Sequence, residues 1–380
     1  MSRILRVALV GCGGMGGGHA TAIATGTGIS YYGENMPGFP VEEMDPHSTN
    51  LSGKLALAGI WDIAPARQEW ARAHGYFVYD GFEAVLADPT VDIVLIATPN
   101  HLHKELAIAA MRAGKHVLCE KPVTPASKDL EEILAVAKET GRVFYPRQNR
   151  RWDKDFLIMK KVYEENLVGK VFNIESRVMG SRGIPGDWRG VKAYGGGMML
   201  DWGVHLIDRL VDMVKEPLKR VYCTMTHITN DECDDGFQAQ LVWQSGLTAS
   251  VEVGTCHFIP HPLWYVAGDQ GTAIIEDWMH PGYLVRLKSW EDRDAAPIMA
   301  GEGVTKTMAP RSGRSEERLE LPDIVYDHNA LYANVADCIN GDAPQIVTGQ
   351  QALRVLKIME ACFESAETGR AVFLPEDKPV

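Results

Sequence analysis

The sequence lacks the features that would mark a membrane protein or a secreted protein. No apolar run in its 380 residues approaches the roughly 20 residues that a helix needs to span a bilayer, and the first apolar run, residues 4–10, leads straight into glycines. Its seven cysteines are scattered and include no CxxC pair. We therefore expect reduced thiols and a cytoplasmic protein without a membrane partner.

Basic residues are also in short supply. Lys and Arg number 38 against 50 Asp and Glu, and the net charge of −12 argues against nucleic acid as a partner. The hydrophobic content of 46% and the charged content of 23% are ordinary for a soluble globular protein. A chain of this length suggests two or three domains.

A glycine-rich segment stands close to the N-terminus. The β-rich run 5–10 leads into GCGGMG at residues 11–16, and a helix is predicted at about 17–24. Gly11 would allow a tight turn, Gly13 would let the backbone approach a pyrophosphate, and Gly16 would let helix and strand pack closely. The helix N-terminus would then face the phosphates. A plain glycine turn is the alternative, but the strand–turn–helix context favours dinucleotide binding.

The dinucleotide fingerprint expects an acidic residue about 20 residues further on, at the end of the second strand. Here residues 26–53, rich in Gly, Pro, Asn and Ser, are predicted to form a loop insertion before a strand at 55–61. Asp62 follows this strand, and we assign it to the ribose hydroxyls. The alternative is that Asp62 caps the helix that Pro65 opens. A carboxylate there would repel a 2′-phosphate, which favours NAD over NADP.

Strands and helices alternate up to residue 146. Asn100 is a natural N-cap for one of the helices, and His101 and His103 do not share a helix face, so no metal site is predicted there. The alternation is typical of a doubly wound parallel sheet, and residues 1–146 are predicted to form an α/β Rossmann-type domain. Predicted helices cover 82–86, 100–112 and 126–140, and predicted strands cover 91–98, 116–121 and 142–145.

After residue 146 the apolar pattern changes to period two. Residues 147–380 are therefore predicted to form an α+β domain with a large, mostly antiparallel open sheet. A long loop is predicted at 289–317. Predicted strands cover 171–178, 221–226, 237–243, 247–253, 264–267, 272–275 and 283–288, and predicted helices cover 155–166, 327–339 and 349–367.

One predicted helix of this second domain carries three polar residues. Three glycines at 195–197 precede Asp201, His205 and Asp208, which lie at i, i+4 and i+7 and so share one face. A solvated helix face is the plain alternative. A metal pair of Asp201 and His205 has the right spacing but no third ligand in the sequence, and no metal is predicted.

The segment HVLCEKP at 116–122 places a charge pair at a strand end. Pro122 has no N–H and biases the backbone before it, so Glu120 and Lys121 are expected at the carboxyl edge of the sheet. Ligands bind at that edge in open α/β sheets. The alternative is an ordinary surface ion pair.

Four motifs together resemble the glucose–fructose oxidoreductase/inositol dehydrogenase (Gfo/Idh/MocA) family. They are GCGGMG at 11–16, ATPNHLH at 97–103, AMRAGKHVLCEKP at 110–122 and GGGMMLDWGVHLID at 195–208. The resemblance covers nearly all of the chain. It implies an N-terminal nucleotide domain and a C-terminal open sheet that often forms a dimer or tetramer contact. The insertion at 26–53 departs from the family pattern and leaves open the ribose contact; it could form part of a lid or a subunit contact.

The resemblance also implies roles for individual residues. Lys121 would lie beside the nicotinamide and the substrate hydroxyl, and Asp201 and His205 would complete the catalytic group. The cofactor would contact Gly11, Gly13, Met15, Gly16, Asp62, Thr98, Asn100, His103 and Glu120. The substrate would contact Lys121, Arg151, Trp188, Asp201 and His205.

The resulting hypothesis is an NAD-dependent, or less favourably NADP-dependent, oxidoreductase acting on a secondary hydroxyl of a sugar, glycoside or cyclitol. A glycoside 3-dehydrogenase and an inositol dehydrogenase are the first two types to test. His205 would take the hydroxyl proton, Lys121 would stabilise the alkoxide, and Asp201 would orient the ring or bind a neighbouring hydroxyl. The alternatives are a keto-sugar or imine/biliverdin-type reductase, a redox-neutral NAD-dependent glycosidase and a non-catalytic NAD-binding regulator. A homodimer or homotetramer is expected.

Overall fold

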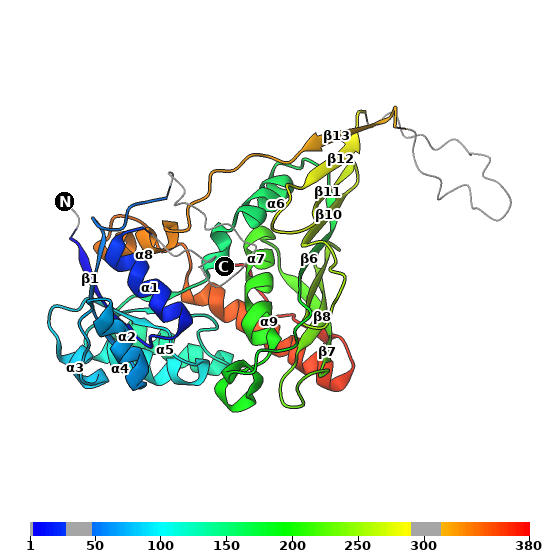
Figure 1. Cartoon of the computed structure of the whole chain (residues 1–380). Coiled ribbons are helices and arrows are strands. Elements are labelled where there is room, and N and C mark those ends of the chain that lie inside the picture. The colour runs from blue at the N-terminus through cyan, green and yellow to red at the C-terminus, as the bar shows by residue number, and fades with distance from the viewer. Residues whose placement is uncertain (1–2, 28–47, 290–312) are drawn as a thin grey trace.

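The computed structural model describes residues 3–27, 48–289 and 313–380, and most of the predicted insertion at 26–53 lies outside them. Two sheets stand on either side of a group of helices (Figure 1). Helix α9 (Gly349–Thr368) lies between them and packs against α5 (Ser127–Thr140) and β7 (Leu218–Thr226). None of the helices in these ranges has both the length and the apolar character needed to cross a bilayer.

The first sheet is parallel, with the order β2-β1-β3-β4-β5 in the described ranges. Every residue of β3 is buried, as expected for an apolar strand covered on both faces. The order reverses direction between β1 and β3, which is where open α/β sheets bind ligands at their carboxyl ends. The strands are β1 (Leu5–Val10), β2 (Leu55–Trp61), β3 (Ile93–Ile96), β4 (His116–Cys119) and β5 (Phe144–Pro146).

The helices of the first part follow the predicted alternation, with one correction. Asn100 does not cap α4, because a 3-10 turn (Asn100–Leu102) precedes that helix. The Asn100 Nδ2 instead donates to the carbonyl oxygen of Gly195 at 2.8 Å, and so joins the first part to the second. The helices are α1 (Gly14–Thr25), α2 (Pro65–Ala73), α3 (Phe82–Ala87), α4 (His103–Arg112) and α5.

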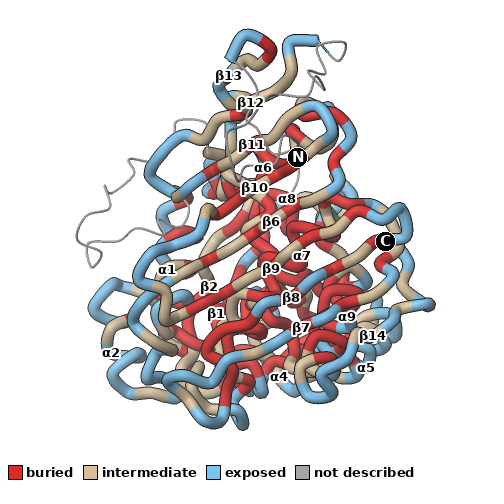
Figure 2. The backbone as a smooth tube through the Cα atoms, turned by 90° about the vertical axis from the view of Figure 1, so that its right-hand side faces the viewer, coloured by how far each residue is buried: buried red, intermediate tan, exposed pale blue. Residues whose placement is uncertain are grey.

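The second sheet has the order β13-β12-β11-β10-β6-β9-β8-β7-β14 within the described residues. All its neighbours are antiparallel except β6 and β9, which run parallel. Figure 2 looks onto its outer face, where buried and less buried residues alternate along the strands. Besides β7, the strands are β6 (Val171–Met179), β8 (Gly236–Trp243), β9 (Thr248–Gly254), β10 (Trp264–Gly268), β11 (Gly271–Ile275), β12 (Tyr283–Leu287), β13 (Glu316–Glu320) and β14 (Val372–Phe373).

The fold is thus the expected α/β sheet followed by a large, mostly antiparallel sheet. Two short edge strands were not predicted: β13, which begins inside the predicted loop 289–317, and β14. Besides α9, the helices of the second part are α6 (Lys154–Glu164), α7 (Val204–Met213) and α8 (Ala330–Asn340).

Helix α8 follows the second sheet in the chain but packs against the first sheet. Its residues Leu331 and Val335 lie in the same buried cluster as Leu5 and Ile93 of the first sheet. The chain therefore returns to the first sheet after completing most of the second, and the core of the nucleotide-binding part contains residues from near both ends of the sequence.

Candidate active site

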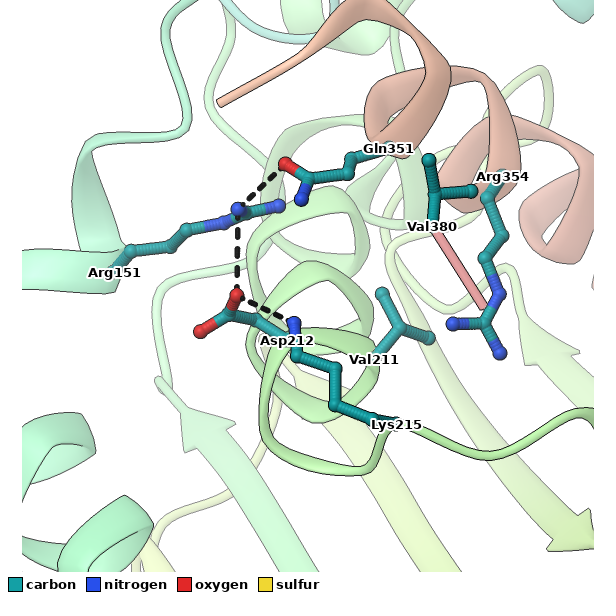
Figure 3. A pocket seen from close by; sticks show the side chains of 7 residues that line it. All are labelled: Arg151, Val211, Asp212, Lys215, Gln351, Arg354 and Val380. Carbon is teal, nitrogen blue, oxygen red and sulfur yellow. Dashed lines mark hydrogen bonds and ion pairs between the residues drawn. The ribbon is translucent and has the colours of Figure 1, made fainter. Parts of the chain in front are cut away.

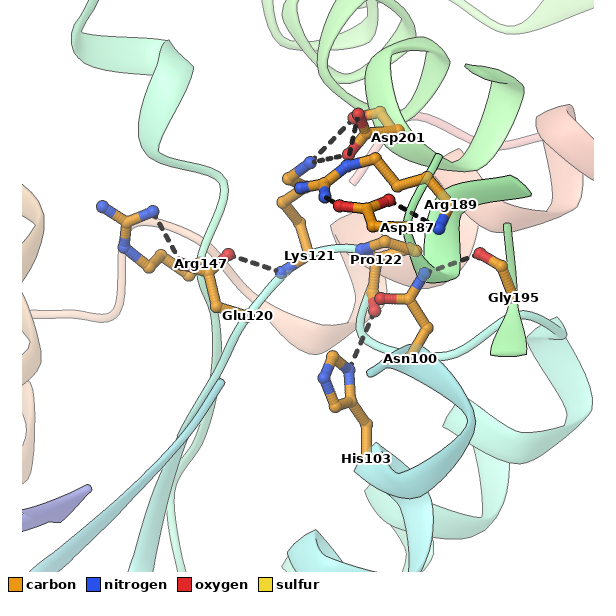
Figure 4. Close-up of polar contacts among 10 residues, drawn as sticks. All are labelled: Asn100, His103, Glu120, Lys121, Pro122, Arg147, Asp187, Arg189, Gly195 and Asp201. Carbon is orange, nitrogen blue, oxygen red and sulfur yellow. Dashed lines mark hydrogen bonds and ion pairs between the residues drawn. The ribbon is translucent and has the colours of Figure 1, made fainter. Parts of the chain in front are cut away.

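The carboxyl end of β4 carries the charge pair that the sequence singles out. The N–H of Glu120 donates to the Ile96 carbonyl at 2.9 Å, which extends the pairing with β3 one residue beyond the strand. The chain then bends at Lys121 and Pro122, which are joined by a cis peptide bond. This bend turns the Lys121 side chain away from the sheet and toward the second part of the molecule (Figure 4).

Lys121 meets Asp201 across the two parts. The Lys121 Nζ donates to Asp201 Oδ1 and to the Asp201 main-chain oxygen, both at 2.8 Å. The other carboxylate oxygen, Oδ2, accepts from Arg189 Nε at 3.2 Å (Figure 4). The Lys121 side chain is 18% exposed, so the ion pair is held in place but stays open to solvent on one side. The predicted meeting of strand end and helix is present.

Asp201 lies in a π-helical turn (Met199–Gly203) that leads directly into α7. Turns of this kind are rare and are often found at functional sites. Asp234 supports the turn, because its side chain accepts from the Met199 N–H and its carbonyl oxygen accepts from the Met198 N–H. Gly197 has φ +108°, and a Cβ there would lie 2.2 Å from Asp234 Oδ1, so both its backbone conformation and its neighbour require glycine.

Burial and neighbouring charges set the charge states of Asp201 and His205. Burial raises the pKa of Asp201, but the cations Lys121 and Arg189 outweigh it and hold the pKa below its usual value. Burial lowers the pKa of His205 well below 6.5, and the positive charges of Lys121 and Arg150 lower it further. At neutral pH the site therefore holds an ionised Asp201 and a neutral His205.

His205 keeps a free polar atom. Its Nδ1 is buried and makes no hydrogen bond to any residue that the structure describes. The carboxylate of Asp201 is occupied by Lys121 and Arg189, and no hydrogen bond joins it to His205 among those residues. Orientation of the His205 ring by Asp201, one of the two roles suggested from the sequence, is therefore not seen in this arrangement.

The glycine loop has the shape expected of a dinucleotide cradle. Gly11 has φ +91° and a Cβ there would lie 2.7 Å from the Ala97 oxygen, while a Cβ on Gly16 would lie 2.1 Å from the Gly11 oxygen. Gly13, in contrast, has no atom of a described residue within 4 Å of a Cβ position, so among those residues the space in front of it is open. A pyrophosphate fits these residues, because the loop packs tightly behind and leaves its outer side free. Met15, in the first turn of α1, is exposed.

Comparison with protein families decides the class of this chain. A model of the oxidoreductase family with an NAD-binding Rossmann fold, GFO_IDH_MocA, matches residues 5–148, and a model of the GFO/IDH/MocA C-terminal domain matches residues 156–274. The chain belongs to the Gfo/Idh/MocA oxidoreductase family. The resemblance drawn from the four motifs is confirmed, and the first part of the chain is an NAD-binding Rossmann domain.

Individual proteins that resemble this Gfo/Idh/MocA chain are consistent with its assignment to the family. An uncharacterized oxidoreductase of Schizosaccharomyces pombe is 38% identical over 320 residues, which is 79% of this chain and 85% of the relative. Scyllo-inositol 2-dehydrogenase (NADP(+)) of Bacillus subtilis is 27% identical over 77% of this chain and 81% of its own. The crystal structure of an NAD-binding protein from Listeria innocua has a TM-score of 0.82 and 42% identity, covering 98% of both chains.

Asp62, the acidic residue predicted for this family's ribose site, is engaged with its own loop. Its Oδ2 accepts from the Cys12 N–H, and its Oδ1 accepts from the Ala64 N–H at 2.7 Å just before α2. The first contact ties the end of β2 to the glycine loop, and the second closes a turn before α2. Ala64 is the N-cap of α2 and no side chain caps that helix, so the alternative role of Asp62 as its cap is wrong. The ribose contact stays a prediction.

Thr98, Asn100 and His103 brace the loop after β3. The His103 ring is fully buried, with one nitrogen 2.9 Å from the Thr98 oxygen and the other 3.0 Å from the Pro122 oxygen. Burial lowers the pKa of His103, so the ring is neutral at pH 7 and only one of its nitrogens can donate. These contacts join the loop after β3 to the bend at Lys121 and Pro122. A contact with the nicotinamide would have to come from groups of this loop other than the His103 ring.

Arg151 lies in a buried ion pair. Its Nε and Nη2 donate to the two carboxylate oxygens of Asp208 at 2.8 and 2.6 Å, and its Nη1 donates to Gln351 at 2.9 Å. Figure 3 shows the guanidinium group of Arg151 pointing toward Asp212 and Gln351. The third residue of the predicted polar helix face, Asp208, is thus used to hold α7 in place, and the structure does not bring Arg151 to the Lys121–Asp201 pair.

Trp188 is linked to the Lys121–Asp201 pair by Arg189, the next residue in the chain, which contacts Asp201. It lies in a 3-10 turn (Trp188–Gly190), and the Arg189 guanidinium group sits over its ring with 4.7 Å from Cζ to the ring centre. The sequence marked Trp188 and Arg189 together as a weaker candidate for substrate contact, but it did not indicate that Arg189 pairs with Asp201. Its contact with Asp201 could have been found only from the fold, because the two are twelve residues apart on different elements.

Proposed function

We propose that the protein is a dehydrogenase that oxidises a secondary hydroxyl of a sugar, glycoside or cyclitol, with NAD preferred over NADP. The observation that carries the proposal is the pairing of the Lys121 ammonium with ionised Asp201, one helical turn before the neutral His205. The relative named as a scyllo-inositol 2-dehydrogenase supports the substrate class. The carboxylate of Asp62 supports NAD, since it would repel a 2′-phosphate.

Lys121 supplies the positive charge in this proposal. Two of its N–H groups are used by Asp201, and the third remains to donate to a substrate hydroxyl oxygen. As the hydroxyl loses its proton, the oxygen becomes negative and the charge-assisted bond from Lys121 strengthens. Asp201 and Arg189 fix the position of the ammonium group before the substrate arrives. The nicotinamide, when bound, accepts the hydride.

His205 takes the hydroxyl proton. It is neutral at pH 7 and has an unpaired nitrogen, so it can accept without first losing a proton of its own. Burial and the positive charges of Lys121 and Arg150 keep His205 neutral, and these charges would also stabilise an alkoxide beside it. The same conditions oppose a lasting imidazolium, so the ring must pass the proton on rather than store it.

A screen of polyols, glycosides and inositols with NAD or NADP tests the proposal. The measurement is the increase in absorbance of the reduced cofactor. We expect turnover with at least one of them, and a loss of about 10²–10⁴-fold in kcat for His205→Asn. NADH binding, measured by fluorescence, should persist in that variant. Turnover equal to the parent enzyme in His205→Asn would remove His205 from the mechanism.

The same screen separates the alternatives. A reductase would oxidise NADH or NADPH with keto-sugars or imines but would leave the hydroxyl compounds unchanged. A redox-neutral glycosidase would release a sugar with no net change in cofactor absorbance. A regulator would bind the cofactor and turn over none of these compounds.

We also propose that the outer face of the second sheet joins two or four copies of the chain. Phe172 on β6 and Tyr222 on β7 are both exposed, and a second copy packed against these strands would cover them. Light scattering should give a mass of two or four chains, and Phe172→Glu should lower it.

A further inference from the structure

Four loops leave the second sheet at the same end, next to the Lys121–Asp201 pair. The register places the last residues of β6, β9 and β11 beside the first residues of β8 and β10. One of these loops, residues 276–282 between β11 and β12, carries Trp278. Its indole is 44% exposed, although large aromatic side chains are usually buried.

Trp278 continues a row of rings that starts at the buried histidine. The ring centres of His205 and Trp202 are 6.0 Å apart, edge to face, and those of Trp202 and Trp278 are 6.3 Å apart at an interplanar angle of 36°. The guanidinium group of Arg150 lies over Trp202, with its Cζ 4.4 Å from the ring centre. Trp202 directly follows Asp201, so the row begins at the proposed reacting group and ends at the surface.

The loop that presents Trp278 is structured by its own contacts. Asp277 Oδ1 accepts from the N–H groups of Met279 and His280 at 2.7 and 2.8 Å, and the His280 ring lies 2.9 Å from Asp277 Oδ2. These bonds form a tight turn around Trp278 and limit the freedom of the loop. An exposed indole held in this way loses little entropy when it binds a ligand.

We propose that Trp202 and Trp278 form a second subsite, which binds a sugar ring attached to the ring that is oxidised. The inference rests on the proposed function and names its substrate class: a glycoside with two linked rings, in preference to a free monosaccharide or cyclitol. A pyranose ring has one face of C–H groups, which buries well against a flat indole, while its hydroxyls point outward to polar partners. A ring held at Lys121 and His205 would lie beside Trp202, whose ring adjoins that of His205, and the surface indole of Trp278 would serve the next ring.

Binding to NADH-loaded enzyme tests the subsite without turnover, because a hydroxyl compound cannot be oxidised by reduced cofactor. We would measure the binding of glucose and methyl glucoside as one-ring probes and of maltose, cellobiose and phenyl glucoside as two-ring probes by calorimetry. The variants are Trp278→Ala, Trp278→Phe and, as a control on an exposed aromatic residue at the other edge of the sheet, Phe373→Ala. In parallel, kcat/KM for the same probes is measured with NAD.

We expect the two-ring probes to bind more tightly than the one-ring probes. Trp278→Ala should lower two-ring affinity and kcat/KM by about 10-fold, leave the one-ring values unchanged, and be partly rescued by Trp278→Phe. An equal effect of Trp278→Ala on both classes, or no effect, would overturn the subsite and leave the proposed function intact. Tryptophan-dependent binding, with no turnover of these probes or of any compound in the wider screen, would support the subsite and overturn the proposed function. Failure of every two-ring probe to bind would overturn the subsite.

Discussion

Glu120 and Lys121 are neighbours in sequence but belong to two different kinds of polar cluster. The Glu120 carboxylate is buried and faces the inside of the Rossmann domain, where it meets His19 at 2.7 Å and Arg147 at 2.9 Å. It also accepts the Lys121 N–H at 3.0 Å. Lys121 faces the other way, toward Asp201, and stays partly exposed. The bend at Pro122 thus separates a closed network from an open one.

The difference shows what each cluster can do. Burial raises the pKa of Glu120, but Arg147 and His19 outweigh it, so the carboxylate stays ionised and is bound on several sides by the chain itself. A charge of this kind is costly to disturb. The contact of Glu120 with the cofactor, expected from the sequence, stays a prediction. Lys121 has one N–H to spare and solvent beside it, so a substrate can be added without breaking the existing pair.

The largest effect should come from the open cluster and should fall on activity. Lys121→Met removes the cation that stabilises the alkoxide, and we expect a loss of about 10²–10⁴-fold in kcat/KM on the substrate found by the screen. The free energy of unfolding should fall by about 1–3 kcal/mol, because the pair is mostly buried but Asp201 keeps its contact with Arg189. Lys104→Met, which breaks the pairs of Lys104 with Asp129 and Glu132, is the control and should leave activity unchanged. Full activity in Lys121→Met would remove the distinction between the two clusters.

The closed cluster should respond in stability instead. Glu120→Gln removes the charge of Glu120 from its buried pair with Arg147, and we expect a cost of about 3–5 kcal/mol in urea unfolding. Glu131→Gln, which breaks an exposed pair with Lys357, should cost no more than about 1 kcal/mol. Similar costs for the two variants would mean that burial does not set the difference.

The start of the same strand gives a pH-dependent comparison. Burial lowers the pKa of His116 to about 4, Arg142 adds to this effect, and the neutral ring accepts from the Val143 N–H at 3.0 Å. In the unfolded chain this histidine titrates near 6.5, so the unfolded state binds the proton first as the pH falls. Stability that is complete above pH 6.5 should therefore decline between about 6.5 and 4, by about 1–2 kcal/mol after allowing for partial exposure.

Urea unfolding at several pH values measures that decline. His116→Gln removes this contribution, so the slope of stability against pH should be smaller in the variant than in the parent protein. An unchanged slope would assign the acid sensitivity to the other buried histidines.

The smallest effect concerns the outer end of the closed network. The Tyr332 hydroxyl contacts His19 Nδ1 at 2.5 Å, and Tyr332→Phe should cost about 1–2 kcal/mol by leaving that nitrogen without a partner. Tyr194→Phe, on an exposed tyrosine, should be neutral. A neutral Tyr332→Phe would show that the network ends at His19.

Local pattern was enough to predict most of the fold. The apolar run of β3 and the alternation along β8 and β9 reflect burial on two faces and on one face, and such patterns are visible in any short window. The edge strands β13 and β14 do not show them, because β13 is largely charged and β14 is two residues long. Their pairing depends on neighbours that are already in place.

The sequence predicted those contacts of the candidate site whose residues lie in recognisable motifs. It missed the contacts between residues that are far apart in the sequence and belong to no motif. The meeting of Lys121 with Asp201 follows from two motifs, and the structure contains it. The contacts of Glu120 with His19 and of His19 with Tyr332 join residues 101 and 313 positions apart, and no local signal indicates them. Asn100 is the instructive error: its side chain can cap a helix or reach another segment, and the nearby Gly195 carbonyl decided the outcome.

The place of α8 in the first sheet's core has a consequence for how the protein is made. Synthesis proceeds at about 5–20 residues per second, so the ribosome releases β5 long before α8, by an interval on the order of tens of seconds. During that interval the Rossmann sheet lacks Leu331 and Val335 from its core, and His19 lacks Tyr332. The nucleotide-binding part can therefore reach its final packing only after most of the second sheet has been synthesised, which couples the maturation of the cofactor site to completion of the polypeptide.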